Sequence, residues 1–264
     1  MEIRDKVVWI TGASSGIGEA LTYASVEAGA KVIISARRVE ELNRVKSQCG
    51  ARQDRVFIEP MDLAQLDDIE NRVKEWAEKL GRIDILINNG GISQRAETHE
   101  TPLSVDRRIM EVNYFGQITL TKAVLPYMMS QKSGHIAIIT SISGKFGFPL
   151  RSAYAASKHA LHGFFESLML EQTDTGVGVT LVNPGRIKTN ISLNALTKDG
   201  TAHGEMDPGQ EKGISAEACA QAILKAIRKN KPEVNIGKGD IALVYLKRYV
   251  PGIFRWIARR VSAK

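Results

Sequence analysis

The sequence has few cysteines, and their positions exclude two kinds of protein. Cys49 and Cys219 are the only cysteines among 264 residues, and they lie far apart with no second pair. Disulfide-stapled secreted domains and cysteine-based metal sites both need closely spaced pairs. The two thiols are therefore interpreted as buried or idle side chains of a protein in a reducing compartment, and we predict no metal site.

The sequence also lacks a long hydrophobic run. Its first apolar stretch, VVWIT, is too short for the core of a signal peptide and leads straight into a glycine-rich loop. No stretch approaches the roughly 20 apolar residues that a membrane-spanning helix needs. These two absences predict a cytoplasmic protein.

Acidic residues are missing from the end of the chain. Six of the 36 Lys and Arg residues follow Asp240, whereas none of the 29 Asp and Glu residues does. The net charge of +7 therefore arises almost entirely in this tail, and the rest of the chain is close to neutral. A near-neutral body argues against a nucleic-acid partner, because nucleic-acid-binding domains gather basic side chains on one face.

What the sequence does contain is a regular alternation of short β-branched runs and longer segments of helical periodicity. It begins with KVVWIT, GEALTYASVEAG and KVIISA, and it ends with SAEACAQAILKAIRK followed by EVNI. Such alternation is typical of right-handed βαβ units, which form a parallel sheet covered by helices on both faces. We predict an α/β fold with a single Rossmann-type, doubly wound parallel sheet of about seven strands in residues 1–240. Residues 241–264 are predicted to be a C-terminal extension and not a separate domain.

A glycine-rich loop, TGASSGIG, follows the first predicted strand and precedes the first predicted helix. Glycines at such a turn let a pyrophosphate approach the backbone N–H groups at the helix N-terminus. The spacing of Gly12, Gly16 and Gly18 differs from the usual G-x-G-x-x-G fingerprint, so a purely structural turn remains an alternative. The functional interpretation is a dinucleotide site.

The end of the second predicted strand, IISARR, bears on the choice of dinucleotide. An acidic residue here would hydrogen-bond the adenosine ribose of NAD. This chain instead has Ala36, followed by Arg37 and Arg38, whose guanidinium groups suit a 2′-phosphate. The alternative is a solvated arginine pair, although the helix dipole disfavours cations at a helix start. We therefore predict NADP(H), with the hydroxyls of Ser14 and Ser15 as further phosphate donors.

Two further motifs follow predicted strands. MDL would place Asp62 near the adenine amino group, and NNGG, at 88–91, would let the backbone approach the adenosine ribose. Each motif alone is a weak signal. Ligands of doubly wound sheets bind at the carboxyl ends of the strands, and these motifs stand there in order.

With these motifs, the chain resembles the short-chain dehydrogenase/reductases, in the branch with a T-G-x-x-x-G-x-G loop and a Y-x-x-x-K pair. The resemblance runs from about residue 7 to 190 and, in register, through the helix predicted at 215–229. One departure is Gly91, where this family more usually has alanine; it should leave the fold intact. The sequence is most similar to the hydroxysteroid and retinoid-type members. The segments that carry this closer similarity are SARRVEEL, NNGGISQR and YAASKHALHGF, whereas EVNYFG, ITSISG and NPGRIKT match the family as a whole.

The YAASK segment puts a phenol and an ammonium one helical turn apart. Neighbours at i and i+4 also share a helix face for purely structural reasons. A free phenol has a pKa near 10, so a cation that favours the phenolate is needed for proton transfer near neutral pH. The resemblance implies that Tyr154 exchanges a proton with a carbonyl or alcohol. It also implies that Lys158 lowers the pKa of Tyr154 and binds the nicotinamide ribose.

The resemblance assigns roles to two further polar residues. Ser141, thirteen residues before Tyr154, would hydrogen-bond the reacting oxygen, and Asn113 would hold a water linked to Lys158. The alternative for Asn113 is a polar kink in a buried helix. The nicotinamide would supply the hydride. The residues implied to bind the cofactor are Gly12, Ser14, Ser15, Gly16, Ile17, Gly18, Arg37, Arg38, Asp62, Leu63, Asn89, Gly90, Tyr154, Lys158, Pro184, Gly185, Ile187 and Thr189.

The expected activity is an NADP(H)-dependent interconversion of a small-molecule carbonyl and a secondary alcohol. By the same resemblance, a homodimer or homotetramer built on the helices around Asn113 and Tyr154 is expected. A non-catalytic nucleotide-binding regulator or scaffold on the same fold is the alternative, because fold does not determine function.

Two regions depart from the alternation. Residues 192–213 are polar, turn-rich and longer than an ordinary loop, and the resemblance implies a substrate lid at about 191–214 that orders over the nicotinamide. The tail has the pattern of a basic amphipathic helix. It either lies on an anionic membrane surface or packs against the body or another subunit. Its apolar stripe is Ile253, Phe254, Ile257, Ala258 and Val261, with Arg255, Arg259 and Arg260 on the other side.

Overall fold

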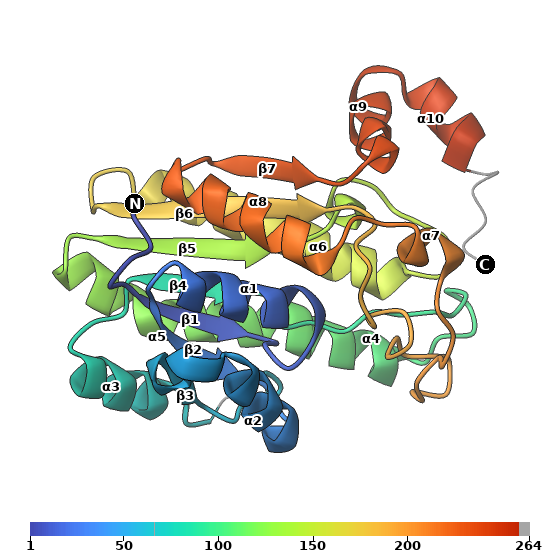
Figure 1. The fold of residues 1–264 in the computed structure, drawn as a ribbon. Helices are drawn as coiled ribbons and strands as arrows, with labels where there is room; N and C mark the ends of the chain where they lie inside the picture. The colour runs from blue at the N-terminus through green and yellow to red at the C-terminus, as the bar shows by residue number, and fades with distance from the viewer. Residues whose placement is uncertain (66, 259–264) are drawn as a thin grey trace.

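Parallel strands form a single sheet at the centre of the molecule, which a computed structural model describes for residues 1–65 and 67–258 (Figure 1). Within that part of the chain, seven strands pair in the order β3-β2-β1-β4-β5-β6-β7. The direction of strand progression reverses between β1 and β4, the switch point at which doubly wound sheets bind ligands. The predicted fold is confirmed. The strands are β1 (Val7–Thr11), β2 (Lys31–Ser35), β3 (Val56–Ile58), β4 (Ile85–Asn88), β5 (Gly134–Ile139), β6 (Val177–Pro184) and β7 (Glu233–Ile236).

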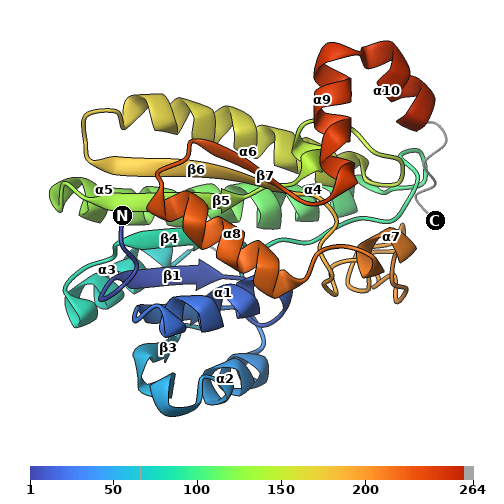
Figure 2. The same ribbon diagram turned by 45° about the horizontal axis from the view of Figure 1, so that its top comes forward.

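Helices cover both faces of this sheet (Figures 1 and 2). Buried side chains of α1, α2 and α8 form one core layer, and those of α3, α5 and α6 form the other. The main helices are α1 (Gly16–Glu27), α2 (Val39–Gln48), α3 (Ile69–Leu80), α4 (Leu103–Met110), α5 (Gly116–Ser130), α6 (Ser152–Glu171), α7 (Pro208–Glu211), α8 (Ala216–Arg228), α9 (Ala242–Tyr249) and α10 (Pro251–Ala258). Short turns of other helix types are η1 (Gly50–Arg55), η2 (Glu111–Phe115), η3 (Ile142–Gly144) and η4 (Gly239–Ile241).

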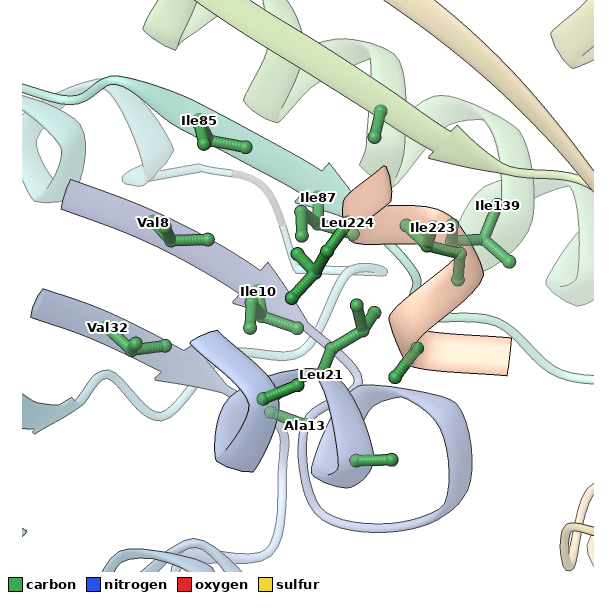
Figure 3. Packing of buried hydrophobic residues seen from close by; sticks show 14 of the residues in the cluster. Val8, Ile10, Ala13, Leu21, Val32, Ile85, Ile87, Ile139, Ile223 and Leu224 are labelled. Atoms are coloured by element: carbon green, nitrogen blue, oxygen red, sulfur yellow. The ribbon is translucent and has the colours of Figure 1, made fainter. Parts of the chain in front are cut away.

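Successive residues of β1 point into opposite core layers. Val8 and Ile10 belong to the layer that contains Leu21 of α1 and Leu224 of α8 (Figure 3), whereas Trp9 belongs to the other layer. Each fully buried aliphatic side chain of this kind contributes about 1.5–3 kcal/mol through removal from water. Because both faces of the strand are covered, β1 is apolar without alternation, as parallel strands usually are.

One long helical segment contains a local change of helix type. The chain is helical from Leu103 to Ser130, but the middle of this segment, η2, is a π-helical turn. Such turns insert an extra residue and occur often at functional sites. Here the turn carries Asn113, which is fully buried.

The two regions predicted to depart from the strand–helix alternation also depart from it in the structure. Residues 191–214 contain turns, isolated bridges and the short α7. The tail forms α9 and α10, with a break at Val250, and lies at the carboxyl end of the sheet near α7 (Figures 1 and 2). None of the helices in the described ranges combines the length and the apolar character needed to cross a membrane.

The predicted apolar stripe of the tail is divided in the structure. Phe254 is buried, with its ring centroid 5.0 Å from that of Phe146, so this part of the stripe packs on the body. Ile253 is 51% exposed, and Ile257 and Ala258 are partly buried. The remaining stripe and charge positions, Arg259, Arg260 and Val261, lie outside the described residues.

Candidate functional site

A cleft of about 960 Å³ opens at the carboxyl ends of β1, β2 and β4. The opposite wall comes from residues 189–202, so the predicted lid segment closes one side of the cleft. The sequence-predicted residues that line it are Gly12, Ser14, Ser15, Gly16, Ile17, Arg37, Arg38, Asp62, Leu63, Asn89, Gly90 and Thr189. The structure therefore brings together the motifs that follow four different strands.

The backbone geometry of the glycine-rich loop explains why glycine occurs at three of its positions. Gly12 and Gly16 have φ values of +64° and +59°, a left-handed conformation that favours glycine. At Gly18, a Cβ atom would lie 2.6 Å from the side-chain amide nitrogen of Asn89, so only glycine lets α1 start this close to the loop. These constraints leave the backbone of the loop open toward the cleft, which fits a pyrophosphate group.

Two polar residues join the loops after β1 and β4. The hydroxyl of Thr11 accepts hydrogen bonds from the backbone N–H groups of Asn89, at 3.0 Å, and Gly90, at 2.9 Å. In return, Asn89 Nδ2 donates to the backbone carbonyl of Thr11 at 2.9 Å. The two loops therefore form one rigid floor for the cleft.

Arginine side chains lie at the edge of the cleft beside β2. Arg37 and Arg38 are exposed at its edge, beside the small side chain of Ala36. Nearby Arg44 has a different role, because its guanidinium bonds the carboxylates of Glu19, at 2.7 Å, and Glu41, at 2.8 Å. Arg44 thus fastens α2 to α1, whereas Arg37 and Arg38 line the cleft together with Arg108 and Lys198.

A smaller cavity of about 90 Å³ lies next to the cleft, toward β5 and β6. It shares Ile17, Asn89, Gly91, Thr189 and Ile191 with the large cleft, so the two spaces are adjacent. The predicted residues that line this smaller cavity are Ser141, Tyr154, Lys158, Pro184, Gly185 and Ile187.

Ser141 and Tyr154 form a hydrogen-bonded pair in the small cavity. Ser141 follows β5 in extended conformation, and its side-chain oxygen accepts from Ser143 N at 3.1 Å. Tyr154 lies in the first turn of α6 and is buried. Burial raises the pKa of Tyr154, while the hydrogen bond with Ser141 and the positive charges of Arg151 and Arg95 act in the opposite direction.

Lys158 lies one helical turn after Tyr154, and its side chain is also buried. Its Nζ donates to the backbone carbonyl of Ile139 at 2.8 Å and lies 5.8 Å from the centroid of the Tyr154 ring. Burial lowers the pKa of Lys158 to about 7, so its charge at neutral pH is only partial. The positive charges that oppose the effect of burial on Tyr154 in the structure come from Arg151 and Arg95. The expected lowering of the pKa of Tyr154 by Lys158 stays a prediction.

Asn113 joins the π-helical turn to the loop after β4. Its Oδ1 accepts from Ile92 N at 2.8 Å, and its Nδ2 donates to Ile92 O at 2.9 Å and to Ser157 Oγ at 3.0 Å. A Cβ atom at Gly91 would lie 3.1 Å from Asn113 Oδ1 and 3.7 Å from Lys158 Nζ. Asn113 and Lys158 therefore both lie beside Gly91, and alanine at this position would make a tight contact with Asn113 Oδ1 and an ordinary one with Lys158.

Sequence reasoning missed Arg95, Arg151 and Asp207. These three residues form an ion cluster next to the small cavity, and the two arginines act on the pKa of Tyr154. Two sequence signals could have suggested them: Arg95 follows the NNGG motif by four residues, and Arg151 precedes Tyr154 by three.

The structure has a large cleft, next to a cavity lined by Ser141, Tyr154 and Lys158, on a doubly wound sheet. This arrangement has counterparts among known proteins. Residues 6–199 match the family described as short chain dehydrogenase. A Drosophila melanogaster protein, "Dehydrogenase/reductase SDR family protein 7-like", is 42% identical over 268 residues, which cover 100% of this chain and 82% of that protein. A solved short-chain dehydrogenase from Streptomyces avermitilis is 28% identical, with a TM-score of 0.81, over 98% of this chain and 99% of that one. The closed form of a serine dehydrogenase complexed with NADP+ is 26% identical, with a TM-score of 0.78, over 88% of this chain and 94% of that one.

This chain therefore belongs to the short-chain dehydrogenase/reductase family, a family of oxidoreductases.

Proposed function

We propose that this protein transfers a hydride between NADP(H) and a small-molecule substrate, interconverting a carbonyl and a secondary alcohol. The observation that carries the proposal is the convergence of Ser141, Tyr154 and Lys158 in a cavity adjacent to the large cleft. Bound in this cleft, the nicotinamide would supply the hydride chemistry. The protein's own residues would then handle the proton and the charge on the substrate oxygen.

Tyr154 is the proposed proton donor and acceptor. Its phenol would donate a proton to the carbonyl oxygen in reduction and remove one from the alcohol in oxidation. Ser141, which is already hydrogen-bonded to Tyr154, would donate to the same substrate oxygen and stabilise the charge that develops there. Lys158 and Asn113, both beside Gly91, would deliver protons through the proposed water and replenish Tyr154.

The proposed preference for NADP(H) rests on Ala36, Arg37 and Arg38. No carboxylate stands at position 36 to repel a 2′-phosphate, and both arginines are exposed at the edge of the cleft. Guanidinium groups bind phosphates through paired, charge-assisted hydrogen bonds. The similar serine dehydrogenase was solved with NADP+, which agrees with this preference.

Substituting Tyr154→Phe tests the proposed reaction. We expect NADPH binding to be retained and turnover to fall by about 10²–10⁴-fold over a panel of steroids, retinal, quinones and dicarbonyls, because proton transfer is lost. Tyr114→Phe is a matched control, since Tyr114 packs on Phe115 and Phe164 away from the small cavity. Unchanged turnover of Tyr154→Phe would favour the non-catalytic alternative.

We also propose that the protein is a homodimer or homotetramer through the helices around Asn113 and Tyr154. Phe115 and Leu170, on these helical segments, are 44% and 77% exposed. Apolar side chains of this size at the surface favour an interface between copies.

The C-terminal helices are the proposed site of peripheral contact with an anionic membrane. Large apolar and aromatic side chains are exposed there, including Tyr245, Tyr249 and Ile253, and the segment after Asp240 contains basic but no acidic residues. Aromatic side chains favour the membrane interface, and basic ones are attracted to anionic lipids. Phe254, packed on Phe146, would fix α10 to the body while the exposed side chains contact lipid.

A further inference from the structure

Three charged residues from distant parts of the chain meet beside Tyr154. Arg95 follows β4, Arg151 immediately precedes α6, and Asp207 lies in the lid segment (residues 191–214). Arg95 bonds both carboxylate oxygens of Asp207, at 2.5 and 3.2 Å, and Arg151 Nη2 bonds one of them at 2.8 Å. The three side chains are only 3%, 14% and 13% exposed for Arg95, Arg151 and Asp207. This group, the Arg95–Asp207–Arg151 cluster, is thus largely shielded from water.

The cluster contains two cations and one anion. Burial alone would raise the pKa of Asp207, but the hydrogen bonds and charges of Arg95 and Arg151 outweigh it and hold the pKa below its ordinary value. Asp207 is therefore ionised at neutral pH and neutralises only one of the two guanidinium groups. Removing one member of a buried ion pair is strongly destabilising, because it leaves the other charge unpaired.

The lid segment is attached to the body in two different ways. Its first part pairs through the backbone, because Leu196 N donates to Ser93 O and Arg95 N donates to Leu196 O, both at 2.8 Å. The part around α7 is held by side chains: Asp207 contacts the two arginines, and Gln210 Nε2 donates to Ile187 O at 3.0 Å. Gln210 lines the small cavity itself. After α7, Ile214 pairs with the backbone of Arg186 and Lys188, at 3.1 and 2.9 Å, so the cluster holds the part of the segment that lies between two backbone pairings.

The same cluster is connected to the helix turn that carries Tyr154. Gln94, next to Arg95, accepts a hydrogen bond from Ala153 N at 2.9 Å, and Ala96 N donates to Leu150 O at 3.3 Å. Arg151 and Tyr154 are three residues apart at the start of α6. The cluster thus links the lid segment to the start of α6, on which Tyr154 lies.

We propose that Arg95 and Arg151 are positioning residues of the reaction: by binding Asp207 they fasten the α7 part of the lid segment over the small cavity and hold a net positive charge beside Tyr154. The expected effect on the reaction rests on the proposed function, whereas the attachment of the lid segment by the ion pairs does not. The two parts of the proposal therefore have separate measurements.

Asp207→Asn tests the fastening of the lid segment in the full chain. We expect the backbone amides of residues 205–212 to exchange hydrogen at least about tenfold faster than in the wild type, because the buried ion pairs are lost. We expect KM for the carbonyl substrate to rise, with the Kd of NADPH changed by less than about twofold, since Asp207 does not line the large cleft.

The matched control is Glu100→Gln. Glu100 also pairs with the lid segment, through Lys198 at 3.6 Å, but this pair is about half exposed and should contribute little. Amide exchange of Asp207→Asn equal to that of the wild type, or equal acceleration in Glu100→Gln, would overturn the fastening role. Because exchange needs no catalysis, this result is independent of whether Tyr154→Phe abolishes turnover.

Arg151→Gln tests the charge beside Tyr154. The groups that face Tyr154 are Lys158 from α6, Arg95 from the loop after β4, Ser141 after β5, and Arg151 itself. Without Arg151, the phenolate is less favoured, which raises the pKa of Tyr154. The rate of alcohol oxidation should therefore begin to rise at a higher pH than in the wild type. Arg151→Lys keeps the charge and should restore the profile. Identical pH profiles for the wild type and Arg151→Gln would contradict the charge role.

Discussion

At the scale of single residues, burial and a few charges set the chemistry of the site. Tyr154 and Lys158 are both buried, and burial favours the neutral form of each, raising one pKa and lowering the other. With a pKa of about 7, Lys158 carries only part of a positive charge at neutral pH. The permanently charged guanidinium groups of Arg95 and Arg151 are better suited to favouring the phenolate, because arginine stays protonated even when buried.

Ala36→Asp tests cofactor selection at a single position. A carboxylate there would repel a 2′-phosphate and accept hydrogen bonds from a free ribose, so we expect the Kd of NADPH to rise at least about tenfold and that of NADH to fall. Isothermal titration with both cofactors measures the change. Ala36→Asn, which adds the same volume without charge, is the control and should weaken NADPH binding much less. Parallel changes for both cofactors in Ala36→Asp would argue against the proposed 2′-phosphate site.

At the scale of elements, the sequence predicted the strands because buried parallel strands are continuous apolar runs. It also predicted the motif residues of the large cleft, since each follows a strand whose end could be recognised. It did not predict the π-helical turn η2, because EVNYF has the same periodicity as the flanking helices. The turn carries the bonds that Asn113 makes with Ile92, twenty-one residues away. The contact between Arg95 and Asp207 spans 112 residues, and no local pattern marks it.

Asn113→Ala tests how far this turn depends on one side chain. The change would leave the N–H and C=O of Ile92 without their partner, so we expect the free energy of unfolding to fall by about 2–4 kcal/mol. Urea denaturation measures it. Asn71→Ala is the control, because Asn71 bonds Asp68 at an exposed position. A loss for Asn113→Ala no larger than for this control would show that η2 is held by packing alone.

At the scale of the whole molecule, the large cleft, the lid segment and the C-terminal helices all lie at the carboxyl end of the sheet (Figures 1 and 2). The proposed membrane contact would therefore bring the small cavity close to a lipid surface. A substrate that partitions into lipid would then have a short path to Tyr154.

Flotation with anionic vesicles tests this arrangement. We expect the full-length chain to float with phosphatidylserine vesicles and the double variant Tyr249→Ser, Ile253→Ser to lose this binding, because exposed apolar area is removed. Leu103→Ser removes an exposed apolar side chain elsewhere, 61% exposed on α4, and should leave flotation unchanged. Equal flotation of the double variant and the wild type would exclude the tail as the membrane contact.

Titration of tyrosinate absorbance tests the claim that the surrounding cations make Tyr154 a proton carrier. The difference between the titrations of the wild type and Tyr154→Phe gives the pKa of Tyr154. In the protein without cofactor, we expect the pKa of Tyr154 to lie above its ordinary value of 10, because burial dominates. In the complex with NADP+, the added positive charge should bring this pKa below 10, and the rate of alcohol oxidation should rise with pH through the same value. A Tyr154 pKa that stays above 10 in the NADP+ complex would contradict the proposed mechanism.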